Sequence, residues 1–313
     1  MDVEREASPQ PNVGPTHRWI PILANPKAGT GKRKNRLAEL VHQLELRGFS
    51  PEVFHDRERF LLALEVPEAL ATCHCVVAAG GDGTIGWIIN RLRDIPLAIF
   101  PTGSENLLAR HFGIRRRPIA VAEMIADNQR HPLDIGIVNG HRFTLMATAG
   151  FDAHVVDLVH RERTGHVQRW HYATAIIRAF CFYRFPKMTI FVDDEPTGIV
   201  AYHALFANLP DYALRLSFHR NASGQDGRLD LILLERPGRF HVLRYLFALL
   251  TGRLHELPDV RHRSIEKARV EVAGPVAIQA DGDPAGALPA LFTIEPASLE
   301  VLVPKGFQEH PDH

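Results

Sequence analysis

Blocks of apolar positions alternate with polar ones along the first 130 residues of the chain. In RKNRLAELVHQLELRG, apolar side chains recur at Leu37, Leu40, Val41 and Leu44 with charged residues between them. This spacing predicts an amphipathic helix that ends at Gly48. Comparable patterns predict further helices at 57–71, 84–93, 105–113 and 119–127. Short apolar runs predict strands at 18–26, 50–55, 73–81 and 95–103.

The pattern changes after about residue 132 and becomes rich in strands. A hairpin is predicted at the Asn139-Gly140 pair, which is a strong turn signal. Residues 187–208 have the pattern of two more strands, and helices are predicted only at about 154–183 and 240–253. The remaining strands are predicted at 227–235, 268–274, 276–284 and 299–304. This pattern of short strands with few helices is typical of a mainly antiparallel β domain.

The fold class expected from both patterns is α/β, with a doubly wound N-terminal nucleotide-binding domain and a C-terminal, mainly antiparallel β-sandwich domain. The N-terminal tail is expected to be loose because it is polar and rich in proline. The last strand is expected to pack back on the first domain. The predicted divisions are a tail at 1–17, an α/β domain at 18–131, a β-rich domain at 132–304 and a tail at 305–313.

Composition narrows the function classes. The chain has 313 residues with 36 Lys+Arg and 36 Asp+Glu, so it lacks the basic excess typical of a nucleic-acid binder. Three cysteines do not make a disulfide framework and suit a reducing compartment. Neither a signal peptide nor an apolar run of about 18 residues is present. We therefore expect a cytoplasmic protein that is able to contact a membrane surface peripherally.

Three glycine-rich loops, at 25–32, 80–84 and 101–106, each follow a predicted parallel strand. The carboxyl ends of such strands meet at one rim, where ligands bind. In GGDGT, consecutive glycines leave backbone amides available to bind an anion, and phosphate is the anion we expect there. Asp82 would bind a nearby Mg²⁺ or a ribose hydroxyl, or it would orient the loop. The structural alternative is a plain turn with Asp82 as a helix N-cap.

The other two loops supply side chains as well as backbone. NPKAGTGK is not a P-loop, because it lacks the first glycine and has Arg33 where Ser or Thr should stand. It still offers Lys27 and Lys32 to a polyphosphate. In PTGSENLLAR, Thr102 and Ser104 can donate to phosphate or cap the next helix. Asn106 can bind a base or fix the loop.

Taken together and in this order, these loops resemble the catalytic domain of the diacylglycerol kinase family, which includes sphingosine kinases and bacterial soluble lipid kinases. Three later segments agree with that family: GFDAHV at 150–155, ASGQDGRLDLILL at 222–234 and IQADGDP at 278–284. The resemblance covers about residues 18–304. GGDGT alone is shared with NAD kinases and phosphofructokinases, so the full set is the specific signal. The family fold implied is an α/β domain followed by a β-sandwich-like domain, with ATP in the cleft between them.

The resemblance implies roles for individual residues. Asp226 would be an acidic ligand of a structural Mg²⁺, with the backbone carbonyls of Ser223 and Arg228 completing that site. Asp281 or Asp283 would be the base that takes the proton from the acceptor hydroxyl. The residues implied to bind ATP are Asn25, Pro26, Lys27, Gly29, Lys32, Gly80, Gly81, Asp82, Gly83, Thr84, Ser104 and Asn106.

Two positions depart from the family pattern. The family has glutamate where this chain has Asp283, which shortens the reach by one methylene and leaves open which aspartate acts. Bacterial diacylglycerol kinases carry Asn-Asp in the third loop, where the aspartate helps to organise metal. Here Asn106 is followed by Leu107, as in sphingosine-kinase-like members, so both the strict diacylglycerol assignment and the metal network stay open.

The function expected is that of an ATP- and Mg²⁺-dependent lipid kinase acting on diacylglycerol, a sphingoid base or a related lipid. The alternatives are an NAD kinase-like enzyme and a nucleotide-binding regulator with weak or no transferase activity. Residues 170–185 and 240–254 are rich in apolar and aromatic positions, so each is a candidate surface for a lipid or a bilayer, against ordinary core packing. Arg115, Arg116 and Arg117 either attract acidic head groups or form a solvated loop. A homodimer is one option for the oligomeric state.

Overall fold

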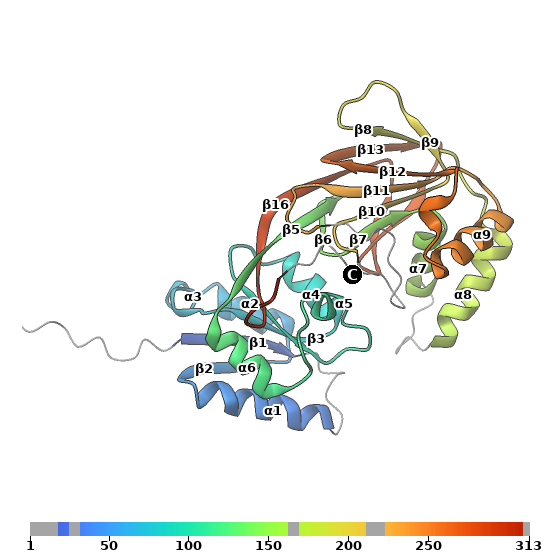
Figure 1. The fold of residues 1–313 in the computed structure, drawn as a ribbon. Coiled ribbons are helices and arrows are strands. Elements are labelled where there is room, and N and C mark those ends of the chain that lie inside the picture. The colour runs from blue at the N-terminus through green and yellow to red at the C-terminus, as the bar shows by residue number, and fades with distance from the viewer. Residues whose placement is uncertain (1–17, 25–31, 162–168, 211–222, 309–313) are drawn as a thin grey trace, which may run out of the picture.

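The computed structural model describes residues 18–24, 32–161, 169–210 and 223–308, and Figure 1 shows its two halves. The N-terminal half has a parallel sheet in the order β2-β1-β3-β4. Strands β3 and β4 are completely buried apolar runs, as expected for a parallel sheet covered on both faces. The bounds of these strands are β1 Arg18–Ala24, β2 Phe49–Phe54, β3 Val76–Gly80 and β4 Leu97–Pro101.

Helices cover both faces of this sheet, which confirms the doubly wound prediction. Helices α1 and α6 lie side by side on one face, and α2, α3 and α4 cover the other (Figure 1). The single helix predicted at 57–71 is wrong: the structure has two, because Pro67 has no amide hydrogen and starts the second one. The bounds are α1 Lys32–Glu45, α2 Arg57–Leu64, α3 Pro67–Thr72, α4 Asp82–Ile89, α5 Leu107–His111 and α6 Pro118–Asp127.

The first sheet continues into the C-terminal half through one long strand, β16, Ala290–Leu302. Its end pairs in parallel with β4 at Val301 and Leu97, and its start pairs antiparallel with β13, Lys267–Val272. It also pairs along its length with β5, Arg130–Val138, which crosses the predicted boundary at residue 132. The division into two domains therefore stays a prediction, since one sheet runs through both halves.

The predicted hairpin at Asn139-Gly140 is confirmed between β5 and β6, His141–Phe143. The segment 187–208 holds three strands rather than the two predicted: β8 Met188–Val192, β9 Ile199–Ala201 and β10 His203–Ala207. The extra strand arises because the chain changes sheets at Tyr202. Strand β9 pairs with β8 in the first sheet, whereas β10 pairs with β7 and β11 in the second.

The second sheet is antiparallel throughout, in the order β12-β11-β10-β7-β14-β15 among the described residues. It packs face to face on the first sheet, as the stacked rings of Phe206 and Phe292, with centroids 3.7 Å apart, show. This confirms the predicted β-sandwich. The bounds of its other strands are β7 Met146–Ala149, β11 Leu229–Leu234, β12 Val260–Ile265, β14 Val276–Ala280 and β15 Asp283–Leu288.

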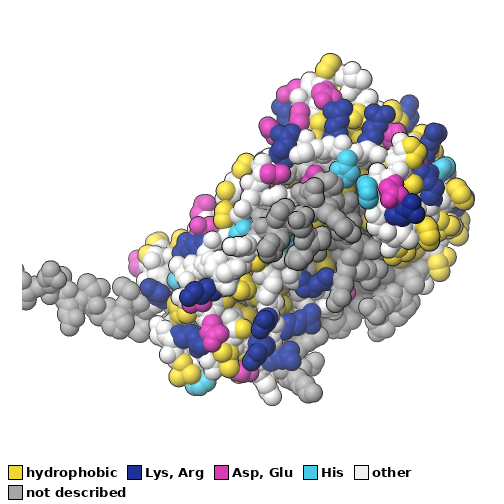
Figure 2. Space-filling view, in the orientation of Figure 1, with side chains coloured by type: hydrophobic (Ala, Val, Ile, Leu, Met, Phe, Trp, Pro, Cys, Tyr) yellow, Lys and Arg dark blue, Asp and Glu magenta, His cyan; other side chains and the backbone are white. Residues whose placement is uncertain are grey.

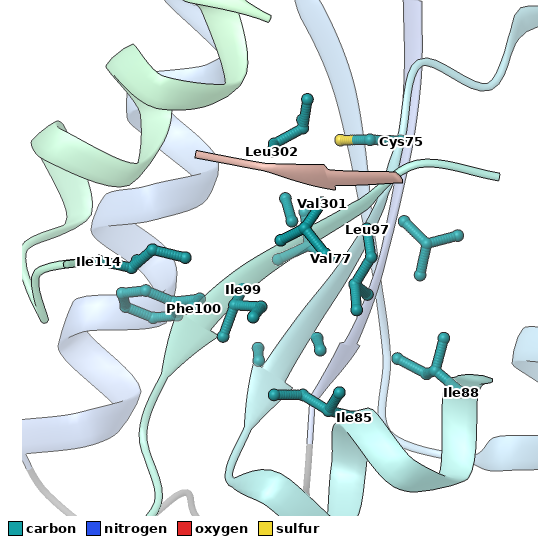
Figure 3. Close-up of a cluster of buried hydrophobic side chains, with 14 of the residues drawn as sticks. Cys75, Val77, Ile85, Ile88, Leu97, Ile99, Phe100, Ile114, Val301 and Leu302 are labelled. Carbon is teal, nitrogen blue, oxygen red and sulfur yellow. The ribbon is translucent and has the colours of Figure 1, made fainter. Parts of the chain in front are cut away.

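Three more helices, α7 Phe151–Arg161, α8 Arg169–Phe182 and α9 Arg239–Leu250, lie at the far end of the molecule from β2 (Figure 1). At the other end, the core fixes the helix that begins at GGDGT. Figure 3 shows Ile85 and Ile88 of α4 facing the sheet, where Val77, Ile99 and Val301 come from three adjacent strands. Because these side chains belong to one buried core cluster, they hold α4 against the sheet, with its N-terminus at the carboxyl end of β3.

Candidate active site

The GGDGT loop is a strand-to-helix turn made of bare backbone. Gly81 is the N-cap of α4 and has no side chain to cap the helix, so Asp82 is the first helical residue and not the predicted N-cap. A Cβ on Gly80 would lie 2.1 Å from the Thr84 hydroxyl oxygen, so only glycine fits there. The start of α4 therefore brings the positive end of the helix dipole to this turn, where Gly83 is exposed and the Thr84 amide already donates to the Gly81 carbonyl.

The third loop lies directly against the second. A Cβ on Gly103 would come within 2.5 Å of the Gly81 Cα, so the two backbones touch. Asn106 is buried and holds its own loop: its Oδ1 accepts from the Gly103 amide at 2.9 Å and its Nδ2 donates to the Gly103 carbonyl at 2.8 Å. Of the two roles considered for Asn106, the geometry favours fixing the loop.

Other side chains also brace these loops. The Asp82 carboxylate accepts from the Leu108 amide at 3.4 Å and so ties α4 to α5. Burial raises the pKa of Asp82, and the charge of Asp281 acts in the same direction. Arg116 donates to the Ser104 carbonyl at 3.0 Å, while Ser104 itself is exposed. Asp82 and Arg116 thus shape the rim on which Ser104 lies.

The second half contributes the Asp281-Gly282-Asp283 turn, whose two carboxylates have different surroundings. The Asp281 carboxylate is enclosed and accepts four hydrogen bonds: from the amide and hydroxyl of Thr144 at 2.7 and 2.9 Å, and from the amides of Leu145 and Met146 at 2.9 and 3.0 Å. Burial raises the pKa of Asp281, and these four bonds oppose that shift. Asp281 therefore fixes the start of β7.

Asp283 is instead directed at the glycine loop. Its side chain is 46% exposed, and its Oδ1 lies 3.5 Å from Nε2 of His160 on α7. Its Oδ2 would lie 3.9 Å from a Cβ on Gly83. Gly282, with a φ of 83°, permits the turn that points the two aspartates in different directions. The structure thus brings Asp283 to the N-terminus of α4 and leaves Asp281 behind it.

A cavity of about 790 Å³ lies between these two walls. Gly81, Gly83 and Thr84 line it from the GGDGT loop, Gly103 lines it from the third loop, and Asp283 faces them. Sequence reasoning missed the rest of its wall, which consists of Arg57, Gly86, Trp87, Asn90, Arg91 and His141.

The missed residues come partly from one face of α4. Gly83, Gly86, Trp87 and Asn90 follow each other at helical spacing, so the periodicity that predicted the helix also predicts that they share a face. The Trp87 ring lies 5.1 Å from the guanidinium carbon of Arg57 and 4.5 Å from that of Arg91. Arg57 and His141 lie far away in the sequence, and only the fold brings them here.

The other end of α4 is fastened to the second half. Asn90 accepts from the Arg142 amide at 2.7 Å and donates to the Arg142 carbonyl at 2.9 Å. The buried Arg142 guanidinium donates to the Ile89 carbonyl at 2.9 Å, at the negative end of the helix dipole. Burial lowers the pKa of Arg142. These bonds fix the position of α4 relative to the C-terminal half.

The residues implied to hold the structural Mg²⁺ lie in a turn before β11. The Asp226 Oδ1 accepts from the Arg228 amide at 2.9 Å, and the Ser223 hydroxyl accepts from the Gln225 amide at 3.3 Å. Burial raises the pKa of Asp226, and the nearby charge of Asp134 raises it further. Within the part of the chain that the structure describes, no cluster of three or more His, Cys, Asp or Glu side chains could hold a metal.

Some predicted nucleotide-binding residues cannot be placed. Asn25, Pro26, Lys27 and Gly29 lie outside the described residues. Lys32 is the first residue of α1, and its side chain also lies outside the described part. The described half of the predicted nucleotide site is therefore the part built by the second and third loops.

In the comparison with known proteins, two family models match the chain. The family model "Diacylglycerol kinase catalytic domain" matches residues 20–138, and "YegS C-terminal NAD kinase beta sandwich-like domain" matches residues 146–303. The diacylglycerol kinase of Mycobacterium tuberculosis is 32% identical over 301 residues, covering 91% of this chain and 95% of that protein. The diacylglycerol kinase of Bacillus subtilis is 25% identical over 300 residues, covering 93% and 98%.

Solved structures support the fold. A putative diacylglycerol kinase from Bacillus anthracis superposes with a TM-score of 0.73 at 19% identity, over 93% of this chain and 99% of that one. The family models and the sequence relatives, rather than the solved structures, place the protein in the class of lipid kinases. The chain belongs to the diacylglycerol kinase family, as the resemblance in its loops implied. Among the described residues, no helix is both long and apolar enough to cross a membrane.

Proposed function

We propose that this protein transfers the γ-phosphate of ATP to a hydroxyl of diacylglycerol. Family membership implies the use of ATP and a lipid acceptor. The observation that carries the proposal is the position of Asp283, whose carboxylate faces the bare backbone of Gly83 in one cavity. Phosphoryl transfer needs such an arrangement, because its catalysis is mainly positioning and charge stabilisation.

In this proposal the phosphates of ATP bind the amides at the start of α4. Gly81 and Gly83 line the cavity without a side chain, and the helix dipole favours negative charge there. The cavity continues along α4 past Gly86 to Trp87, a rise of about 6 Å from Gly83. The nucleoside then extends along α4 toward Trp87, because Gly86 and Trp87 line the cavity beyond the glycine loop.

Asp283 acts as the general base for the acceptor hydroxyl. Asp281 is unsuitable, because its oxygens already accept four hydrogen bonds and are enclosed. Asp283 has free lone pairs and access to the cavity. The imidazole of His160 at 3.5 Å is placed to hold the Asp283 side chain toward the glycine loop. The base takes the hydroxyl proton as the acceptor oxygen attacks the γ-phosphorus.

The residues around Asp226 fit a hard cation. A carboxylate and backbone carbonyls are the donors that Mg²⁺ and Ca²⁺ prefer. The Asp134 carboxylate lies close enough to Asp226 for its charge to raise the pKa of Asp226, and a bound cation would offset both negative charges. We propose that Asp226, with the carbonyls of Ser223 and Arg228, holds Mg²⁺ there. A further Mg²⁺ carried by ATP would neutralise phosphate charge during transfer.

The acceptor is proposed from the relatives. Relatives that match over nine-tenths of the chain include proteins named diacylglycerol kinase, at 32% and 25% identity. The half-buried Leu107 stands where bacterial members have an aspartate, and it packs on the N-terminal core. A sphingoid base therefore stays the second acceptor to test.

The test is transfer of label from [γ-³²P]ATP with Mg²⁺ to diacylglycerol, to sphingosine and to NAD in separate reactions, each followed by chromatography. We expect label in phosphatidic acid from the parent protein, and hardly any from Asp283→Asn. The control Asp127→Asn changes an exposed aspartate on α6 and should retain parental activity. Label in NAD alone, or in no acceptor at all while ATP still binds, would refute the proposed function.

A further inference from the structure

Helices α8 and α9 expose far more apolar area than the rest of the described molecule. Of the 15 large hydrophobic side chains that are exposed, eight lie on these two helices. They include phenylalanines that are 78%, 75% and 69% exposed: Phe182, Phe240 and Phe247. We call these eight side chains the apolar surface: Ile176, Ile177, Phe182, Phe240, Leu243, Leu246, Phe247 and Leu250.

The inward faces of the two helices are already packed, so core packing does not explain the apolar surface. Helix α8 buries Ala175 and Ala179 against α7, and α9 buries Tyr245 and Ala248 against the second sheet. The core-packing alternative therefore holds for the inward faces only. The side chains of residues 170–173 lie outside the described part of the chain.

The two helices form one end of the molecule. Arg239, the first residue of α9, donates to the carbonyls of Phe180 and Cys181 near the end of α8. Figure 1 shows α8 and α9 next to each other, and Figure 2 shows hydrophobic side chains with lysine and arginine beside them at that end. Patches of this kind on a protein mark an interaction site.

The charge around the apolar surface indicates what it binds. The chain as a whole is neutral, but residues 169–187 and 236–255 contain only basic charges. No aspartate or glutamate occurs in either segment. Two of the eight basic residues, Arg244 and Arg253, form ion pairs with Asp259 and Glu256 just beyond the second segment. The other six are Arg169, Arg178, Arg184, Lys187, Arg236 and Arg239. Apolar and aromatic side chains bordered by arginine and lysine suit an anionic bilayer, where the rings enter the acyl boundary and the cations meet phosphates.

The position of the surface relative to the cavity fits the same partner. Helix α7 packs against α8 on one side and against β14 and β15 on the other. Its His160 contacts Asp283, the first residue of β15. A bilayer bound to α8 and α9 would thus lie one helix away from the proposed base.

We propose that α8 and α9 dock this protein on the surface of an anionic lipid bilayer. The proposal rests on the proposed function only in that a lipid acceptor resides in a bilayer. Docking is measured without phosphate transfer, so its failure is distinguishable from failure of the kinase reaction.

The experiment is sedimentation of the full chain with vesicles of phosphatidylcholine, with and without phosphatidylglycerol. The double variant Phe240→Ser/Phe247→Ser should lower the partition coefficient for the mixed vesicles by about tenfold or more, since two exposed rings no longer enter the bilayer. Arg184→Glu/Lys187→Glu, which reverses two exposed charges, should remove most of the preference for phosphatidylglycerol. The control Leu46→Ser/Leu62→Ser changes two exposed leucines of the N-terminal half and should bind as the parent does.

Thermal unfolding and ATP binding of each variant verify that it is folded. If the serine variant does not fold, the charge variant still tests the proposal. Three results would overturn docking: a parent that does not sediment with either vesicle, folded variants that sediment like the parent, or a parental dimer that the serine substitutions dissociate without lipid. The last result would mean that a second copy covers the apolar surface. If the parent binds vesicles but phosphorylates no acceptor, docking stands and the proposed function fails.

Discussion

The two walls of the cavity are built on opposite principles. The N-terminal wall presents bare backbone at Gly81, Gly83 and Gly103, beside side chains of α4 such as Thr84 and Trp87. The C-terminal wall is side chains, with Asp283 between His160 and the glycine loop. Anion binding needs uncovered amides, whereas proton transfer needs a carboxylate at a defined place. The comparison shows why the molecule joins a rigid α/β sheet to a sandwich whose turns carry acids.

The largest expected effect separates the two walls directly. Asp283→Asn removes the proposed base without changing the shape of the wall, so kcat should fall by about 10²–10⁴-fold. The affinity for ATP and the unfolding midpoint should stay close to those of the parent, because the half-exposed Asp283 supports little of the fold. Steady-state kinetics and calorimetry measure the two quantities. Equal kcat in variant and parent would remove Asp283 from the mechanism.

The second prediction concerns the other aspartate of the same turn. Asp281→Ala leaves the amides of Thr144, Leu145 and Met146 without their acceptor, and each buried unsatisfied group costs about 1–3 kcal/mol. The free energy of unfolding should therefore fall by several kcal/mol, and denaturant titration measures it. A variant that is fully stable but inactive would instead identify Asp281 as a catalytic residue.

The third prediction tests the backbone wall. Gly103→Ala places a Cβ 2.5 Å from the Gly81 Cα, so the two loops must separate, at a cost of about 1–3 kcal/mol. ATP affinity, measured by calorimetric titration, should fall about tenfold or more. Gly86→Ala on α4 keeps the contact between the loops, because an added Cβ there meets no atom within 4 Å, and it changes only the cavity wall along the proposed path of the nucleoside. Unchanged ATP affinity in Gly103→Ala would show that the contact between the loops does not shape the site.

The smallest effect tests the support behind the C-terminal wall. His203 Nδ1 accepts from the Phe151 amide at 3.2 Å, and burial lowers the pKa of His203 to about 4. Because folding favours the neutral ring, its contribution to stability is complete above the ordinary value of about 6.5 and is lost as pH falls toward 4. The loss should reach about 1–2 kcal/mol near pH 5.

His203→Gln should flatten the fall in stability between pH 6.5 and 5, measured by denaturant titration at each pH. The exposed His42→Gln is the matched control and should leave the profile as in the parent. If the stability of His203→Gln fell with pH as steeply as that of the parent, groups other than His203 would cause the pH dependence.

The same contrast explains how much could be predicted from the sequence. Alternating strands and helices, the Asn139-Gly140 hairpin and the glycine loops are local signals, so the fold class and the glycine part of the N-terminal wall could be predicted. The different contacts of the Asp281 and Asp283 carboxylates could not be predicted from local sequence, because their partners Thr144 and His160 come from other elements. No spacing in the sequence distinguishes an aspartate that accepts four hydrogen bonds from one that faces a cavity.

The missed elements have similar causes. Pro67 divides a helix that the apolar spacing alone extends, since a ring without an amide hydrogen starts a new one. Arg57 and His141 reach the cavity only through the order of the strands. The exposure of Phe240 and Phe247 is also a tertiary property, because periodicity cannot tell which face of α9 meets the second sheet.

The most direct test of the central claim is a crystal structure with a non-hydrolysable ATP analogue and Mg²⁺. We expect the phosphates on the backbone of Gly81 and Gly83 at the start of α4, and the Asp283 carboxylate facing the terminal phosphate from the opposite wall. A triphosphate bound away from the start of α4, or an Asp283 side chain turned away from the nucleotide, would contradict the account.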